Sequence, residues 1–414
     1  MALTGSTPGR VLIVVENLPV PFDRRVWSEA TTLHAAGYQV SVICPKGMGA
    51  TKGYELIDGI HVYRHPLPLE AEGALGYITE YASALFFEFV LAWWIFFRHG
   101  FDLLHACNPP DTIFLLALPF KLLGRKFLFD QHDINPELYL AKFGRKDRFY
   151  RALCWLERRT FAAADVSIAT NESYRCIAVT RGRMDPERVF VVRSGPKLDR
   201  LRIMPPDPTR RRGARFLVGY VGVIGQQEGI DLLLAAAKHL IEVCGRRDLR
   251  FAIVGGGPAL AEMKLLAAQL GIDGAVDFYG RVSDEILLSV LNTADICVNS
   301  DRVNEMNDKS TMNKIMEYMA LGKPIVQFEL AEGRFSAQEA SLYAAPNDPV
   351  DFARKITELL DDPDKRAAMG SFGRERVERE LTWDREAPKL LAAYDAALRP
   401  VIVRRGVTAR ADTT

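Results

Sequence analysis

Short runs of β-branched and apolar residues alternate with longer helical patterns along most of the chain. A near-continuous apolar strand indicates a sheet covered on both faces, and helices between strands indicate parallel strands. Apolar residues at three- and four-residue steps predict the helices. The predicted strands lie at residues 11–16, 40–44, 103–107, 126–130, 166–170, 189–192, 216–222, 251–257, 276–280, 295–299 and 324–328. The predicted helices lie at residues 24–36, 147–163, 230–243, 257–270, 312–321, 348–360 and 387–398.

Residues 195–215, GPKLDRLRIMPPDPTRRRGAR, interrupt this alternation with prolines and arginines and have no apolar period. Such a composition predicts a linker. We therefore expect an α/β protein of two doubly wound, Rossmann-like domains with a cleft between them. Ligands of such sheets bind outside the carboxyl ends of the strands, so both domains should direct functional loops into the cleft. The polar tail at 403–414 is expected to be loose.

Composition narrows the class of protein. The chain has 414 residues, 48% apolar and 25% charged, as in an ordinary globular protein. Lys and Arg (53) nearly balance Asp and Glu (52), which argues against a nucleic-acid partner. The six cysteines lie far apart, without a C-x-x-C pair, and fit neither a disulfide framework nor a zinc site. The N-terminus lacks the pattern of a signal peptide, and we expect a cytoplasmic protein.

The most hydrophobic run, SALFFEFVLAWWIFF at residues 83–97, complicates this prediction. It is shorter than the ~20 residues that span a bilayer and has Glu88 at its middle, so we do not expect it to cross a membrane. Two interpretations stay open: a core helix between layers, or an element on a membrane surface. The residues that favour the surface element are Trp93, Trp94, Arg98, His99, Lys121, Arg125 and Lys126.

The stretch NDKSTMNKIMEYMALGKPIVQF, residues 307–328, has the most informative chemistry. Ser310 or Thr311 is expected to cap a helix whose N-terminus, aimed at the cleft, favours a phosphate. Lys314 would add a positive charge one turn into the helix. Glu317 would accept two hydrogen bonds from a ribose diol. The alternative is that Lys314 and Glu317 form a surface ion pair three residues apart.

The block KIMEYMALGKPIV at residues 314–326 resembles the nucleotide-sugar signature of glycosyltransferase family 4, the retaining enzymes of GT-B fold. The resemblance covers nearly the whole chain. Other matching motifs are the opening at 11–44, HACNPPD at 105–111, DQHDINPE at 130–137, VVRSGP at 191–196, GYVGVIGQQEGIDLLLAA at 219–236, IVGGGP at 253–258 and VDFYGRV at 276–282. It implies an acceptor-binding domain at 1–198, a nucleotide-sugar-binding domain at 213–381 and a helix at 382–400 that crosses back to the first domain.

The resemblance also implies roles for single residues. Glu317 would hold the nucleotide ribose, and His132 would face the donor sugar and the acceptor. Lys314 would stabilise the diphosphate. Further residues expected on the donor side are Gly225, Arg281, Val282, Asp308, Lys309, Ser310 and Thr311, and those on the acceptor side are Arg24, Arg25, His105 and Asp133. Plainer interpretations stay open for His132, as an exposed loop residue, and for His105, as a loop cap.

Two features depart from the family pattern. The first of the family's paired glutamates falls at Lys309, and the Arg and Lys that clamp the diphosphate fall at Val223 and near Glu228. Loss of one donor to a developing anion typically costs ~3–4 kcal/mol, so another group must replace the clamp. The candidates are Lys314, Lys309, the amides of 310–312 and Arg281. Without a replacement the chain would be a weak or inactive catalyst.

The resemblance implies a retaining hexosyltransferase that moves a sugar from a UDP- or GDP-sugar to a lipid-linked or growing cell-envelope or exopolysaccharide acceptor. The leaving phosphate would deprotonate the acceptor, without any further cofactor. We expect no metal, although Asp301 and Asp308 flank the loop where an ion would bind. The protein would act in the cytoplasm, peripherally on the inner face of the membrane.

Two other functions stay open: a catalytically inactive subunit that binds sugar nucleotides or polysaccharide, and a sugar-nucleotide epimerase. A Rossmann dehydrogenase is a poor match. ENLPVPFD at residues 16–23 follows the first strand without the G-x-G-x-x-G phosphate turn of such enzymes.

Overall fold

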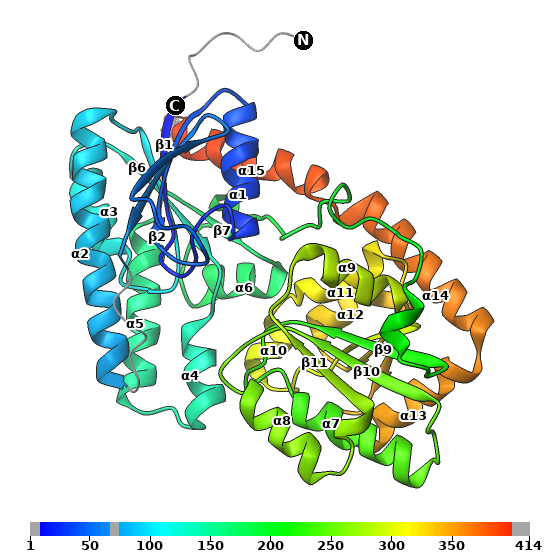
Figure 1. Cartoon of the computed structure of the whole chain (residues 1–414). Coiled ribbons are helices and arrows are strands. Elements are labelled where there is room, and N and C mark those ends of the chain that lie inside the picture. Colours follow the sequence, from blue (N-terminus) through cyan, green and yellow to red (C-terminus); the bar gives the residue numbers. More distant parts are fainter. Residues whose placement is uncertain (1–8, 67–73, 400–414) are drawn as a thin grey trace, which may run out of the picture.

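The computed structural model describes residues 9–66 and 74–399, without the side chains of residues 74–80. The tail at 403–414, expected to be loose, lies outside these residues. Within them the chain forms two mainly parallel sheets, one in each half, covered by helices (Figure 1). The predicted α/β class with two Rossmann-like domains is confirmed.

The sheet of the first domain has eight strands in the order β3-β4-β2-β1-β5-β6-β7-β8. They are β1 (Arg10–Val14), β2 (Gln39–Pro45), β3 (Tyr54–Ile57), β4 (Ile60–His65), β5 (Leu103–Cys107), β6 (Lys126–Gln131), β7 (Val166–Ala169) and β8 (Val189–Val191). The sequence did not predict β3 and β4, which pair antiparallel against the expected parallel order. Their turn, Asp58 and Gly59, has φ of 49° and 81°, as a tight Asp-Gly hairpin requires.

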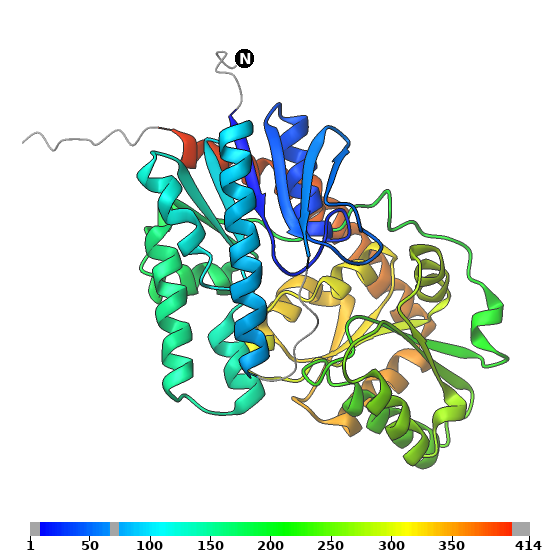
Figure 2. The same ribbon diagram turned by 60° about the vertical axis from the view of Figure 1, so that its left-hand side comes forward.

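Helices cover both faces of this sheet. α1 (Arg24–Ala35) and the C-terminal α15 (Trp383–Leu398) pack on one face. The other face is covered by α2 (Ala74–Arg98), α3 (Phe114–Leu122) and α5 (Arg148–Ala163). Figure 2 shows α2 running along the outside of the first domain. Two shorter helices, α4 (Asn135–Phe143) and α6 (Glu172–Thr180), complete the domain. Because both faces are covered, neighbouring residues such as Leu12 and Ile13 are both fully buried, in different cores.

The second domain has a parallel sheet in the order β11-β10-β9-β12-β13-β14. Its strands are β9 (Phe216–Val221), β10 (Leu249–Val254), β11 (Val276–Gly280), β12 (Ile296–Asn299), β13 (Ile325–Phe328) and β14 (Ser341–Ala344). Its helices are α7 (Ile230–Lys238), α8 (Leu260–Gln269), α9 (Asp284–Thr293), α10 (Glu305–Lys309), α11 (Asn313–Ala320), α12 (Ala331–Ala337) and α13 (Pro349–Asp361). α10, which follows β12, contacts α4 of the first domain.

The chain returns to the first domain near its end. α14 (Pro363–Arg376) packs on the second domain, and α15 crosses to the first (Figure 1). The indole nitrogen of Trp383 donates to Thr32 Oγ1 (2.8 Å), and Tyr394 lies in the core of the first domain. At Gly195 an added Cβ would lie 2.6 Å from the backbone of Thr382, so only glycine fits where these segments cross.

The segment 195–215, predicted as a linker, is packed against α9. Leu201 is fully buried in the core of the second domain. The amide of Met204 donates to Asn292 Oδ1 (2.9 Å), and that of Asp207 donates to Thr293 Oγ1 (2.8 Å). The segment therefore connects the domains along a defined path.

α2 is longer than the apolar run that the sequence singled out. It has 25 residues, and its window Tyr81–Arg98 is long and apolar enough to cross a membrane by length and composition. One stripe, formed by Ala84, Glu88, Ala92 and Ile95, is fully buried, as the helical period predicts. Only 22% of the window is buried, so the interpretation as a core helix enclosed between layers is wrong. Contact with a membrane stays a prediction.

Glu88 is the polar member of this buried stripe. Among the described residues its carboxylate oxygens have no hydrogen-bond partner, and His65 Nε2 lies 4.0 Å from Oε1. Burial, together with the nearby Glu16, raises the pKa of Glu88 to about 8. In the unfolded chain a glutamate has a pKa near ~4.3, so the unfolded chain loses this proton first as the pH rises. Stability is therefore lost between about pH 5 and pH 8.

Glu88→Gln is expected to remove this pH dependence. When the pH rises from 5 to 8, ionisation of Glu88 should lower the free energy of unfolding of the natural protein by about 3 kcal/mol. The Glu88→Gln variant should not show this loss. Urea unfolding at the two pH values measures it. The control is Glu375→Gln, whose side chain is 74% exposed and which should keep the natural slope. The same slope in Glu88→Gln would contradict a protonated Glu88.

Candidate active site at the domain junction

Two adjacent arginines begin α1 and point to different parts of the molecule. Asp23 caps the helix by accepting from the amide of Val26 (3.0 Å), which fixes the first turn. Arg25 turns into its own domain and contacts Asp130. Arg24 reaches the second domain. The N-terminus of α1 therefore joins a buried cluster of the first domain to the domain junction.

Arg25 is the centre of that buried cluster. Its guanidinium donates to both oxygens of Asp130 (2.9 and 3.1 Å), at the carboxyl end of β6, and lies 3.2 Å from Glu29. Asp130 and Glu29 are fully buried. His132 Nε2 lies 2.6 Å from Asp130 Oδ2. A bidentate ion pair allows one geometry, so Arg25 and Asp130 hold the His132 ring in place.

The two carboxyl groups of the cluster have opposite pKa shifts. Burial alone would raise both. Arg25 and His132 nevertheless hold the pKa of Asp130 well below its usual range. Burial and the charge of Asp130 raise the pKa of Glu29 well above its usual range. Burial therefore favours the neutral form of Glu29, and Asp130 is the carboxylate that balances Arg25.

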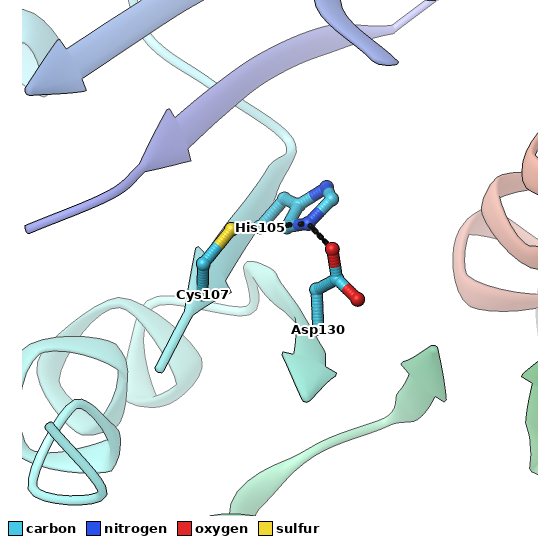
Figure 3. A group of neighbouring side chains, drawn as sticks. All are labelled: His105, Cys107 and Asp130. Atoms are coloured by element: carbon cyan, nitrogen blue, oxygen red, sulfur yellow. Dashed lines mark hydrogen bonds and ion pairs between the residues drawn. The ribbon is translucent and has the colours of Figure 1, made fainter. Parts of the chain in front are cut away.

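His105, Cys107 and Asp130 have the composition of a metal-ligand set (Figure 3). His105 Nε2 lies 3.5 Å from Asp130 and 3.8 Å from Cys107 Sγ. Arg25 contacts the same carboxylate and already supplies the positive charge that an ion would bring. Burial also raises the pKa of the Cys107 thiol well above its usual range, which disfavours the thiolate that binds metals. These residues do not fit a resident metal ion.

His105 was expected on the acceptor side and lies beneath the site instead. It is fully buried, and its Nδ1 shares a hydrogen bond with the hydroxyl of Tyr394 on α15 (2.7 Å). Burial lowers the pKa of His105. The prediction of acceptor contact is wrong for this residue, which links β5 to α15.

Asn108 fixes the loop that contains His132 and Asp133. Its Oδ1 accepts from the backbone amides of both residues (2.8 and 3.1 Å), and its Nδ2 donates to Asp111 (2.8 Å). Burial raises the pKa of Asp133. The His132 side chain is 16% exposed, so a substrate can reach it only at its edge. Both residues therefore lie on one well-held loop.

α11 of the second domain contains Lys314 and Glu317, as predicted, but begins differently. The helix starts at Asn313 after Met312, without a side-chain cap. The prediction that Ser310 or Thr311 caps it is therefore wrong.

Lys314 is paired with an acid from another element. Its ammonium lies 2.9 Å from both oxygens of Asp301, a buried residue just beyond β12. It is also 3.4 Å from the hydroxyl of Tyr220. Burial raises the pKa of Asp301 although Lys314 opposes the shift. Lys314 thus neutralises a buried carboxylate in this structure.

Glu317 lies at the junction, between arginines from two other segments. Arg200, in the segment between the domains, donates to Glu317 Oε1, and Arg24 Nη1 lies 3.4 Å from the same oxygen. Asp284, which begins α9, is 2.7 Å from Arg24 and 3.3 Å from Arg200. The Glu317 side chain is 17% exposed. Glu317 therefore faces the first domain, and protein cations occupy its carboxylate.

The turn between α10 and α11, predicted to bind the donor, joins the two domains. Asn171 of the first domain donates to the carbonyl of Lys309 (2.8 Å) and to Thr311 Oγ1 (3.0 Å). The hydroxyl of Tyr174 lies 3.1 Å from Ser310 Oγ. These groups already have protein partners, so a donor would have to displace them.

The charged neighbours of this turn are also paired. The Lys309 ammonium lies 3.2 Å from buried Glu137 of the first domain and 2.8 Å from Glu305. Asp308 accepts from the amide of Ala331 at the start of α12 (2.8 Å). Neither side chain is placed to meet a donor in this structure.

The remaining donor-side predictions lie around the junction. The amide of buried Gly225 donates to Glu228 (3.1 Å), so it is not free for a phosphate. The Arg281 guanidinium lies over the ring of Phe22 of the first domain, 5.6 Å from its centroid. Val282 packs against the core of the second domain.

Comparison with protein families identifies the two domains. The family described as Glycosyltransferase Family 4 matches residues 23–200. The family described as Glycosyl transferases group 1 matches residues 215–362. The chain belongs to the family 4 glycosyltransferases.

Individual relatives agree with this assignment. The glycosyltransferase is 31% identical over 261 residues to D-inositol 3-phosphate glycosyltransferase of Thermomonospora curvata, covering 58% of this chain and 59% of the relative. Its fold is similar to sucrose-phosphate synthase from Thermosynechococcus elongatus, with a TM-score of 0.73 at 19% identity over 94% of this chain and 98% of that one. It is also similar to Anabaena HepE in complex with UDP-glucose, with a TM-score of 0.69 at 15% identity over 94% and 100% of the chains. These structures show a shared GT-B fold.

Of the charged residues around Glu317, the sequence analysis of this glycosyltransferase named Arg24, on the acceptor side, but missed Arg200 and Asp284. Arg200 lies in an irregular segment, and its partner Glu317 is 117 positions away, so no local spacing marks the pair. Asp301 was considered only as a metal ligand. Asn171 had a local signal, because it caps α6 by accepting from the amide of Tyr174.

Proposed function

We propose that this glycosyltransferase moves a hexose from a UDP- or GDP-sugar to an acceptor hydroxyl, with retention at the anomeric carbon. The observation that carries the proposal is the position of Glu317. A carboxylate on the second domain faces the first domain, where its two oxygens can accept hydrogen bonds from a ribose diol. The Anabaena protein of the same fold, whose structure contains UDP-glucose, supports this class of donor.

The chemistry needs little from the protein beyond position and charge. The bond from the anomeric carbon to the diphosphate breaks, the acceptor oxygen bonds to that carbon on the same face, and the acceptor proton passes to the leaving phosphate. A carboxylate nucleophile, as in retaining glycosidases, would need a free acid beside the sugar. Asp130 is a poor one, because it is fully buried and paired with Arg25. Its arrangement supports direct transfer.

His132 is placed to orient the sugar or the acceptor. When Nε2 donates to Asp130, the other ring nitrogen, Nδ1, is an acceptor for a substrate hydroxyl. Arg25 and Asp130 fix the ring beforehand, which reduces the cost of alignment in the transition state. His132 thus acts as a positioning group on the edge of the first domain.

The experiment is an assay of nucleoside diphosphate release from UDP- and GDP-hexoses, with membrane extract as the source of acceptor. We expect release that depends on the extract, and an α-linked product from an α-linked donor by NMR. Inverted product would contradict retention. Product formation without an acceptor would favour the epimerase.

A second candidate is a catalytically inactive subunit that binds sugar nucleotides. It is favoured by the family resemblance, which puts the diphosphate arginine and lysine at Val223 and near Glu228, where this chain has neither cation. Saturable binding of a nucleoside diphosphate, with no turnover under any acceptor condition, would support this function over the enzyme.

We also propose that the acceptor is a lipid-linked or envelope saccharide and that the enzyme docks on an anionic inner leaflet through the layer of α2, α3 and α5. The outer side of α2 and α3 is apolar. Its exposed residues are Phe86, Phe89, Val90, Trp94, Phe97, Leu115, Leu118 and Leu122. Between the two helices runs an apolar groove of about 320 Å³ lined by residues such as Leu85 and Leu116. Exposed aromatic and aliphatic side chains of this kind enter the bilayer interface.

α5 adds positive charge to this layer, which complements an anionic membrane surface. Its exposed cations are Arg148, Arg151, Arg158 and Arg159, while its one acidic residue, Glu157, is buried and paired with Arg181. Exposed Trp155 and Phe149 lie on the same helix. Because α3 contacts both α2 and α5, the apolar and basic residues belong to one layer. Each cation near an anionic surface contributes about 1 kcal/mol, so this layer suits an anionic membrane.

Vesicle flotation tests the docking layer. The natural protein should float with phosphatidylcholine vesicles that contain phosphatidylglycerol. The double charge reversal Arg148→Glu with Arg151→Glu should weaken binding to these vesicles at least tenfold. Trp94→Ser with Phe97→Ser should weaken it likewise. The control is Leu265→Ser, a similarly exposed residue on α8 of the second domain. Failure of the natural protein to float would overturn the docking proposal.

A further inference from the structure

Four charged side chains meet at the domain junction, and we call them the junction cluster: Arg24, Arg200, Asp284 and Glu317. Arg24 lies 2.7 Å from Asp284 and 3.4 Å from Glu317. Arg200 lies 3.3 Å from Asp284 and directly contacts Glu317. They come from α1, the segment between the domains, α9 and α11. Two positive charges therefore balance two negative ones at the residue proposed to hold the ribose.

The other cations expected near the diphosphate are missing or already contact protein groups, as Arg281 does over the ring of Phe22. By the family resemblance, the usual arginine and lysine would fall at Val223 and near Glu228, and this chain has neither there. Lys314 is held by both oxygens of Asp301, and Lys309 is held by acids of α4 and α10. A leaving diphosphate develops negative charge and needs positive partners in the site.

Arg24 and Arg200 differ from these cations in one respect. They share two acidic partners: Glu317, which the donor itself would take, and Asp284, whose side chain is 45% exposed. When a ribose diol occupies Glu317, both guanidinium groups lose an acceptor at the moment a diphosphate arrives beside them. The Arg24 side chain is 53% exposed and that of Arg200 23%, so both can turn without disturbing a core. A guanidinium matches two phosphate oxygens at once.

We infer that Arg24 and Arg200 are the diphosphate clamp of this glycosyltransferase. They cover Glu317 in the empty site and move to the donor diphosphate when the ribose displaces them. The inference rests on the proposed function and assigns to it two residues outside the second domain. Since Arg24 belongs to the first domain, diphosphate binding also ties the two domains together.

The test compares nucleoside diphosphates with the bare nucleosides. Arg24→Ala and Arg200→Ala should each weaken UDP or GDP binding about tenfold by calorimetry and leave uridine or guanosine binding unchanged or tighter. Only the diphosphate loses a partner, while the ribose site becomes easier to enter. Arg200→Lys should retain part of the affinity. The control is Arg212→Ala, on the same segment but paired with Asp277 (3.0 Å).

The outcomes separate the inference from the proposed function. Equal tightening of diphosphate and nucleoside would mean that the arginines only cover Glu317, and unchanged affinities would mean that they have no role. Either result would overturn the clamp. A natural protein that binds neither UDP nor GDP would instead overturn the proposed function. Unfolding temperatures of the variants show whether a loss of binding is a loss of fold, and Arg24→Gln repeats the test with a side chain closer in size.

Discussion

Glu317→Gln is expected to weaken UDP or GDP binding by about 10²-fold and to reduce turnover at least as much. A carboxylate accepts two charge-assisted hydrogen bonds from a ribose diol, each worth about 1.5–3 kcal/mol. The ion pairs with Arg24 and Arg200, which the donor must displace, offset part of this sum. The amide keeps the shape of the side chain and loses its charge. Calorimetric titration measures the change.

The control for this variant is Glu285→Gln. Glu285 is exposed on α9, next to Asp284 of the junction cluster. Its replacement by glutamine removes one negative charge, as Glu317→Gln does. Its affinity should stay close to that of the natural protein. Equal affinities for Glu317→Gln and the natural protein would mean that the ribose is held elsewhere.

Arg25→Leu is expected to lower the free energy of unfolding by about 3–5 kcal/mol and to abolish transfer. Breaking a buried ion pair by removing one partner leaves the other charge uncompensated, which has this typical cost. Here Asp130 is fully buried, and the leucine also leaves the carbonyl of Val192 without its donor (2.8 Å). Transfer fails because His132 loses the pair that aligns it. Urea unfolding and the release assay measure the two effects.

The matched control is Arg354→Leu. Arg354 pairs with Asp351 on the surface, its side chain is 71% exposed, and such pairs contribute about 0–1 kcal/mol. Arg25→Lys should recover only part of the loss, because an ammonium cannot bind Asp130 bidentately. If Arg25→Leu were as stable as the control variant, the claim that the buried Arg25–Asp130 pair stabilises the fold would be contradicted.

Most strands of the two sheets were predictable, because a strand that is buried on both faces has a near-continuous apolar sequence. β3 and β4 were missed because neither is a continuous apolar run: β3 has four residues and is partly exposed, and β4 contains His61, Arg64 and His65. β14 (SLYA) was missed as well. α14 was missed for a different reason. It contains Gly370, where an added Cβ would lie 2.2 Å from the carbonyl of Gly322. A close helix contact thus requires a residue that normally argues against a helix.

The candidate site was predictable only where it is local. Lys314 and Glu317 were located by their spacing on one helix, and the loop with His132 by its place after a strand. The partners that decide their chemistry come from other elements: Asp301 for Lys314, and Arg200 for Glu317. Long-range ion pairs leave no periodic signal, so Lys314 and the turn before it were assigned to a phosphate although protein groups already engage them.

The most direct test of the account is a crystal structure of the protein with bound UDP or GDP. We predict the ribose hydroxyls on the carboxylate of Glu317 and the diphosphate between the two domains, with Arg24 and Arg200 turned away from Glu317. A nucleotide bound elsewhere, with Glu317 still paired to both arginines, would contradict the account.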